Sequence, residues 1–119
     1  AMKVLAFPYV FQTTWRSILV SEYPNRYTMT NHPMNSVLLA RLLAAVGEFC
    51  FGVQLALGIY TVCARTSAVG PGALLSYVIL LVVLDGAGQC CATYGTIMGS
   101  NLPFFLEGLA WTIILSMTF

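Results

Sequence analysis

Charged and amide side chains interrupt two long apolar stretches of this sequence, and they are its clearest candidates for chemistry. Arg41, Glu48 and Gln54 lie in the first stretch, and Asp85 and Gln89 lie in the second. An ionisable group in the middle of a membrane helix costs at least about 2.5–3.5 kcal/mol on insertion scales. Each of these groups therefore needs a partner or a functional role.

The spacing of these residues predicts that they meet. Arg41 and Glu48 are seven residues apart, so they share a helix face and lie about 10 Å apart along the axis. Gln89 follows Asp85 by one turn. If the two helices pack antiparallel, Glu48 and Asp85 lie at one depth. We expect Arg41, Glu48, Asp85 and Gln89 to form one buried polar cluster that holds the helices together.

Other roles for these side chains stay open from the sequence alone. Arg41 lies near the start of its helix and could extend to the lipid headgroups instead. Glu48 and Asp85 could carry protons or bind a cation near the membrane midplane. Glu107 is expected in the first turn of a third helix, where a carboxylate interacts favourably with the helix dipole. Its expected role is structural.

A third role is cofactor ligation. A chlorophyll magnesium is a hard ion that accepts oxygen or nitrogen donors. The candidate pigment ligands are His32, Glu48, Gln54 and Gln89. Chlorophyll or carotenoid is therefore the only cofactor that we expect, and no metal site is expected.

Small residues recur at four-residue spacing on both apolar stretches, a pattern that lets membrane helices approach closely. The first row runs through Glu48 and contains Ala40, Ala44, Gly52 and Ala56. The second row contains Ala87, Cys91, Gly95 and Gly99, beside Gly88 and Ala92. Both rows predict helix–helix contact.

Prolines and glycines divide the chain into the elements that must position these residues. Pro33 suits a first helical position after a capping Asn31 or His32, and Pro71 and Pro103 open later helices. The expected helices are residues 33–64, 71–98 and 103–119. Short loops make neighbours antiparallel. The predicted fold is all-α: an integral membrane helical hairpin plus the start of a third transmembrane helix, together forming a domain over 33–119.

Residues 1–32 are predicted to form an interfacial N-terminal segment. Aromatic side chains alternate there with arginines and a glutamate, as the headgroup layer favours. Pro8 and Pro24 are expected to break it into short pieces. The opening Ala-Met and the final apolar run favour a partial chain.

Composition restricts the class of protein. Hydrophobic residues make up 59% of the chain and charged residues 8%, against about a quarter charged in soluble domains. Lipid is therefore expected to surround most of the surface. A net charge of +1 argues against a nucleic-acid partner, which requires a basic stripe. His32 is the only histidine, and we expect no enzyme.

The distribution of cationic residues favours an N-terminus on the positive-inside face. Lys3, Arg16 and Arg26 precede the first helix, and only Arg65 lies in the following loop. Positive residues accumulate on the cytoplasmic side of membrane proteins or its organellar equivalent.

Several stretches resemble a group of uncharacterised multi-pass membrane proteins of algae and related protists. They are Trp15-Arg16-Ser17, Tyr23-Pro24-Asn25-Arg26 and the run from Asn35 to Glu48, with Gln54 following. The resemblance covers about the first half of the chain and implies no activity, but it favours a plastid or mitochondrial complex. In light-harvesting antennae the glutamate precedes the arginine. Here Arg41 precedes Glu48, which argues against an antenna protein itself.

Taken together, these features predict an accessory transmembrane subunit of a larger complex, packed against other transmembrane subunits and lipid. A photosynthetic supercomplex of the thylakoid is the first expectation. A respiratory complex of the mitochondrial inner membrane is the second. The rival class is a fragment of a small-solute or proton transporter that uses Glu48 and Asp85.

Overall fold

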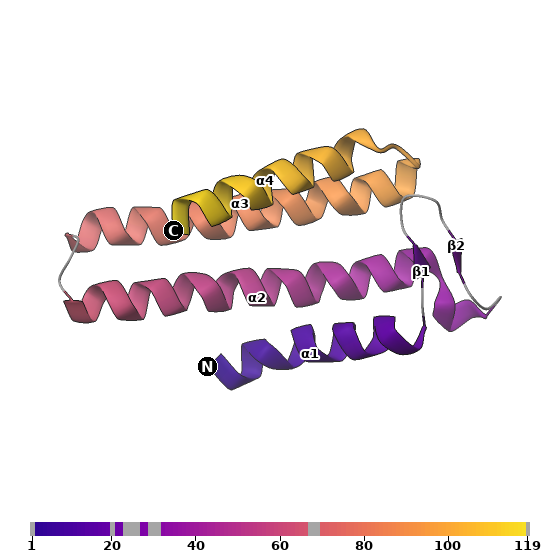
Figure 1. Cartoon of the computed structure of the whole chain (residues 1–119), viewed down its shortest axis with the longest axis horizontal. Helices are drawn as coiled ribbons and strands as arrows, with labels where there is room; N and C mark the ends of the chain where they lie inside the picture. The colour runs from indigo at the N-terminus through magenta and orange to yellow at the C-terminus, as the bar shows by residue number, and fades with distance from the viewer. Residues whose placement is uncertain (1, 20, 23–26, 29–31, 67–69, 119) are drawn as a thin grey trace.

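The computed structural model describes residues 2–19, 21–22, 27–28, 32–66 and 70–118. Helices dominate this part of the chain (Figure 1). In chain order the elements are α1 (Met2–Ile18), β1 (Ser21–Glu22), β2 (Tyr27–Thr28), the 3₁₀ turn η1 (Pro33–Asn35), α2 (Val37–Thr66), α3 (Pro71–Met98) and α4 (Leu102–Thr118).

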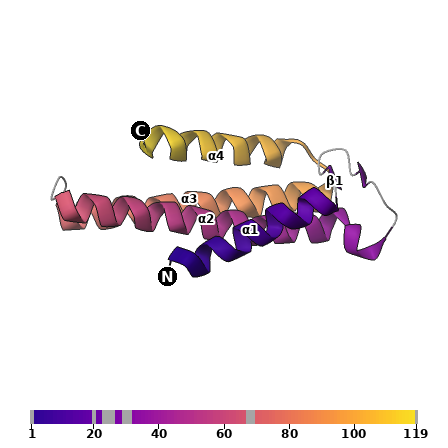
Figure 2. The same cartoon turned by 60° about the horizontal axis from the view of Figure 1, so that its bottom comes forward.

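An antiparallel hairpin of α2 and α3 forms the centre of the molecule. α1 packs on α2 and α4 packs on α3, so the four helices form an elongated bundle that measures 53 × 30 × 17 Å. Figure 2 shows α1 and α4 on different sides of the hairpin. The end of the hairpin where α2 passes to α3 projects beyond both of them (Figures 1 and 2).

The helix boundaries follow the local sequence signals. His32 Nδ1 accepts a hydrogen bond from the Met34 backbone N–H at 3.2 Å, and Pro33 then opens a single 3₁₀ turn before α2. The first long helix therefore begins at Val37 instead of residue 33 and ends at Thr66 instead of residue 64. α3 has the expected bounds. It ends because Gly99 adopts a left-handed conformation, φ 67°, which glycine does without steric cost.

The prediction that Pro8 breaks the N-terminal segment is wrong. α1 continues through Pro8 as one helix of 17 residues. Contacts with α2 stabilise it: the Tyr9 ring stacks on Phe51 with centroids 4.9 Å apart. Gln12 is buried against Gly47, where an added Cβ would overlap the glutamine side chain. Tertiary packing thus compensates for the backbone hydrogen bond that proline cannot donate.

A short antiparallel ladder follows α1. Ser21 pairs with Thr28 and Glu22 with Tyr27. The expected break at Pro24 lies outside the described residues.

The interior of the bundle holds small and polar side chains, whereas large apolar side chains face outward. The buried hydrophobic residues include Ala40, Ala44, Ala56 and Ala92, and the buried polar residues are Gln12, Asn35, Arg41, Asp85, Gln89 and Thr96. Only 17% of the most apolar window of α2 and 28% of that of α3 are buried. Both helices are long and apolar enough to cross a membrane. α4 is shorter, and its apolar stretch covers Leu102–Ser116.

Candidate functional site

Arg41 is the centre of a buried polar cluster that joins three helices. Its side chain, in the second turn of α2, is only 3% exposed. Nη2 donates hydrogen bonds to Gln89 Oε1 on α3 and to Glu107 Oε1 on α4, the latter at 3.2 Å. Nη1 lies 3.7 Å from Glu48 Oε2. The alternative that Arg41 extends to the headgroups is wrong, because its charged end points into the bundle.

Glu48 connects this cluster to α1. Its other carboxylate oxygen lies 3.9 Å from Nη1 of Arg16, in the last turn of α1. The Arg16 side chain is 40% exposed and the Glu48 side chain 21%. Exposure and distance make this outer pair weaker than the contacts of Arg41.

Glu107 has a different position from the one expected. It lies beyond the first turn of α4, which contains no acidic residue. Its side chain, 15% exposed, forms an ion pair with Arg41. α4 approaches α3 closely because it packs against two glycines of α3. A Cβ added to Gly88 would contact Ala110 and Glu107, and a Cβ added to Gly95 would contact Pro103 and Phe104. The first-turn placement of Glu107 is therefore wrong, and its partner is a cation rather than a helix dipole.

Asp85 is buried in the middle of α3, where its side chain packs against Gly52 of α2. It is 2% exposed, and neither carboxylate oxygen has a hydrogen-bond donor in bonding geometry among the described residues. A Cβ on Gly52 would overlap the carboxylate. The contact with Gly52 places Asp85 one helical turn beyond Glu48, so the two carboxyl groups are not level. Glu48 and Glu107 are still close enough to repel a charge on Asp85.

The first row of small residues forms the contact face of α2, as predicted. Ala40, Ala44, Gly52 and Ala56 are all buried. The second row of small residues does not coincide with the contact face of α3. Gly88, Ala92 and Gly95 are buried on α3, whereas Ala87 is exposed and Cys91 is partly exposed. The contact face of α3 therefore follows Leu81, Asp85, Gly88, Ala92 and Gly95 instead of the row through Ala87.

The remaining candidate ligands lie apart from the cluster. His32 is exposed, and its Nδ1 caps η1. Gln54 is partly buried at a shallow apolar hollow on α2 that also contains Leu55 and Gly58. Gln89 Oε1 and both Glu48 oxygens already contact arginine. Pigment ligation by these residues stays a prediction. Within the described residues, no group of three or more histidine, cysteine or acidic side chains could hold a metal ion.

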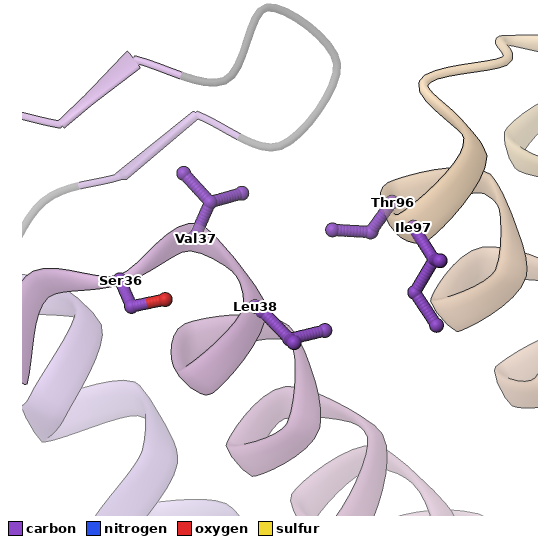
Figure 3. A pocket seen from close by; sticks show the side chains of 5 residues that line it. All are labelled: Ser36, Val37, Leu38, Thr96 and Ile97. Atoms are coloured by element: carbon purple, nitrogen blue, oxygen red, sulfur yellow. The ribbon is translucent and has the colours of Figure 1, made fainter.

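A hollow of about 350 Å³ lies between the start of α2 and the end of α3. Figure 3 shows Val37 and Leu38 on one side and Thr96 and Ile97 on the other, with Ser36 beside them. The Thr96 hydroxyl donates to the Ala92 carbonyl at 3.0 Å. Among the described residues that line this hollow, none has an ionisable side chain.

Sequence reasoning missed the parts that Arg16 and Glu107 play in the polar network, and it missed the burial of Gln12 against Gly47. No local sequence pattern indicates the contacts of Arg16 and Glu107. Their contacts depend on how α1 and α4 align with the hairpin.

No protein-family model matches this sequence, and no curated protein or solved structure is significantly similar to it.

Proposed function

We propose that this chain is an integral membrane protein that serves as an accessory structural subunit of a larger membrane assembly. The observation that carries the proposal is the inverted distribution of side chains, with charged and amide groups between helices and large apolar groups outside. In lipid, this arrangement satisfies polar groups internally. In water, the same surface would far exceed the apolar patches of a few hundred Å² that soluble monomers expose.

The lengths of the helices support membrane insertion. At 1.5 Å per residue α2 is about 45 Å long and α3 about 42 Å, more than the roughly 30 Å hydrocarbon core of a bilayer. Arg41 lies near one end of α2 and Asp85 near the middle of α3. The polar cluster then extends from one membrane face towards the midplane.

The same placement takes α1 into the hydrocarbon layer instead of along its surface. α1 runs beside α2 from the Arg16–Glu48 pair to Met2, whose side chain approaches Gly58. Its outer face carries Val4, Phe7 and other exposed apolar side chains. We therefore propose that the segment predicted as interfacial is a helix that dips into the membrane.

This arrangement removes most of the basis for assigning an orientation. Arg16 pairs with Glu48 instead of lying in a loop, and Lys3 lies at the opposite end of α1. The count of positive residues on the N-terminal side therefore no longer describes one membrane face. An N-terminus on the positive-inside face stays a prediction.

The structural role is supported by what the polar groups contact. Arg41 contacts side chains of α2, α3 and α4, and the cluster thereby holds helices of this chain together. The outer faces of α2 and α3 are free for lipid or for neighbouring transmembrane subunits. We place the parent assembly in photosynthesis first, with chlorophyll or carotenoid bound at the periphery, and in respiration second.

The proposal is tested by isolating the full chain with an affinity tag from its native membranes in a mild detergent. We expect it to resist alkaline carbonate extraction and to migrate with other transmembrane chains on a native gel. An absorbance spectrum of the particle then distinguishes a pigmented from a colourless assembly. A chain that carbonate releases, or one that migrates alone, would contradict the proposal.

A transporter is the second candidate. Asp85 is a buried carboxyl group with no donor in hydrogen-bond geometry among the described residues, and buried ionisable groups in membrane helices often mark proton and ion pathways. Glu48→Gln and Asp85→Asn in reconstituted vesicles separate the two. Lost proton or solute flux with normal assembly supports the transporter. Unchanged flux with lost assembly supports the structural subunit.

A further inference from the structure

Asp85 differs from the other acidic residues of the cluster. Among the described residues, Glu48 and Glu107 form ion pairs with arginine, and Asp85 does not. Its side chain is 2% exposed, and both oxygens are enclosed without a donor in hydrogen-bond geometry. Gln89, one turn along α3, is the polar side chain beside it: its amide is close enough to interact with the Asp85 carboxyl group, although Gln89 Nε2 is not in hydrogen-bond geometry with either oxygen. The other two acidic residues nearby, Glu48 and Glu107, are both paired with Arg41.

The charged groups around Asp85 do not balance. Glu48 acts on it from α2 and Glu107 from α4. Arg41 of α2 pairs with both of these glutamates, and Arg16 joins the cluster from α1 through Glu48. Within the part of the chain that the structure describes, three carboxyl groups thus share two guanidinium groups. If all of them were ionised, one negative charge would remain uncompensated inside the bundle, and Asp85 is its location.

A bare carboxylate at this place is strongly disfavoured. Enclosing an ionised group without a counter-ion costs far more than enclosing a neutral hydroxyl that lacks one hydrogen bond. A hydrated cation would need space, but the carboxyl group packs directly against Gly52, where even a methyl group would overlap it. A proton neutralises the charge without occupying additional volume.

We propose that Asp85 is a proton-binding site whose occupancy controls the contact between α2 and α3. In the packed hairpin a proton is bound to one Asp85 oxygen. When the O–H bond breaks, the proton passes to water and leaves an uncompensated carboxylate against the backbone of Gly52. That charge favours separation of α2 from α3 and entry of water. This inference goes beyond the structural role and does not depend on the parent assembly.

The test uses the unaltered full chain, because Asp85 is the only aspartate in the sequence. Cell-free synthesis with aspartate labelled with ¹³C at its side-chain carboxyl group marks this site alone. The protein is then measured in lipid nanodiscs by infrared spectroscopy. At about pH 5, where an ordinary aspartate is ionised, we expect a protonated-carboxyl C=O band that shifts with the label. A label that shifts only carboxylate bands at this pH would overturn the proposal.

Variants separate Asp85 from its acidic neighbours. In unlabelled protein, Asp85→Asn should remove the protonated-carboxyl C=O band. The variants Glu48→Gln and Glu107→Gln should retain this band. Loss of the band in Glu107→Gln with retention in Asp85→Asn would assign the proton to Glu107 and overturn the proposal. The labelled wild-type measurement decides the case even if a variant does not fold.

A stability measurement tests the coupling to helix packing. The packed state holds a proton that the unfolded chain releases above about pH 4, so thermal stability should fall as the pH rises from about 4 to about 7. Asp85→Asn should remove most of this decrease. A wild-type decrease that persists unchanged in Asp85→Asn would overturn control of the α2–α3 contact by this site.

Discussion

Arg41 stabilises the bundle through the shape of its side chain as well as through its charge. A planar guanidinium presents several N–H donors in fixed directions. Here these donors reach Glu48, Gln89 and Glu107 on three helices. A lysine ammonium is a compact point charge and would not reproduce the same set of contacts.

Replacement of Arg41 by glutamine should therefore be strongly destabilising. Glu107 and Glu48 would lose their buried cation, and breaking a buried pair by removing one partner costs about 3–5 kcal/mol. We expect a decrease of about 3 kcal/mol in the free energy of unfolding, measured by denaturation of the purified chain in detergent. Arg65→Gln is the matched control, since Arg65 is exposed in the last turn of α2. Equal effects of both variants would contradict the central role of Arg41.

Coupling between Arg41 and Glu107 can be measured separately. We expect the double variant Arg41→Gln, Glu107→Gln to be less destabilised than the sum of the single variants, by about 1–3 kcal/mol, because the two side chains share one buried ion pair. The measurement is a double-mutant cycle on the same unfolding assay. Strict additivity would show that the two side chains do not interact in solution.

The residues of the cluster differ in how far the sequence could predict them. The Arg41–Glu48 contact follows from two positions seven residues apart on one helix, which depends only on helix geometry. The sequence favours a helix-dipole role for Glu107, because its contact with Arg41 depends on the alignment of α4 on α3, which the sequence does not show. That alignment is set by Gly88 and Gly95, whose role becomes visible only when the contact face of α3 is known.

The hairpin of α2 and α3 could be predicted from the sequence better than the two helices that pack against it. Pro71 and Gly99 mark both ends of α3 through backbone properties that act locally. Pro8 gave the opposite expectation, because its local preference is overridden where α1 packs on α2. The predicted second row of small residues does not match the contact face of α3. Small residues lie on two adjoining faces of this helix, and their periodicity alone does not indicate which face contacts α2.

The contact between α2 and α3 predicts a specific effect of adding one methyl group. Gly52→Ala would place its Cβ within the Asp85 carboxyl group, and overpacking of this kind costs about 1–3 kcal/mol. Gly108→Ala in α4 meets nothing within 4 Å and should be neutral or stabilising by up to about 1 kcal/mol through helix propensity. Thermal unfolding of both variants compares them. A Gly52→Ala protein as stable as Gly108→Ala would contradict the close packing of the hairpin.

The molecule as a whole has the reverse of the side-chain distribution of a soluble helical bundle: large apolar side chains lie on the surface, and small and polar ones lie in the interior. Burial of apolar side chains away from water usually drives folding, but here alanines, glycines and polar groups fill the interior. Association of such helices depends on close packing and on hydrogen bonds between helices. The polar cluster is therefore expected to contribute a larger share of stability than a similar cluster would in water.

The surrounding medium itself can be tested with a pair of arginine substitutions. Val83 lies near the middle of α3 and is 60% exposed, and Val62 lies near the end of α2 and is 62% exposed. In water, arginine at either exposed position would be harmless. In lipid, Val83→Arg should cost about 2.5–3.5 kcal/mol of insertion free energy, whereas the arginine of Val62→Arg can extend to the headgroups. A translocon insertion assay on the full chain measures the difference, and equal insertion of the two variants would contradict a membrane location for this bundle.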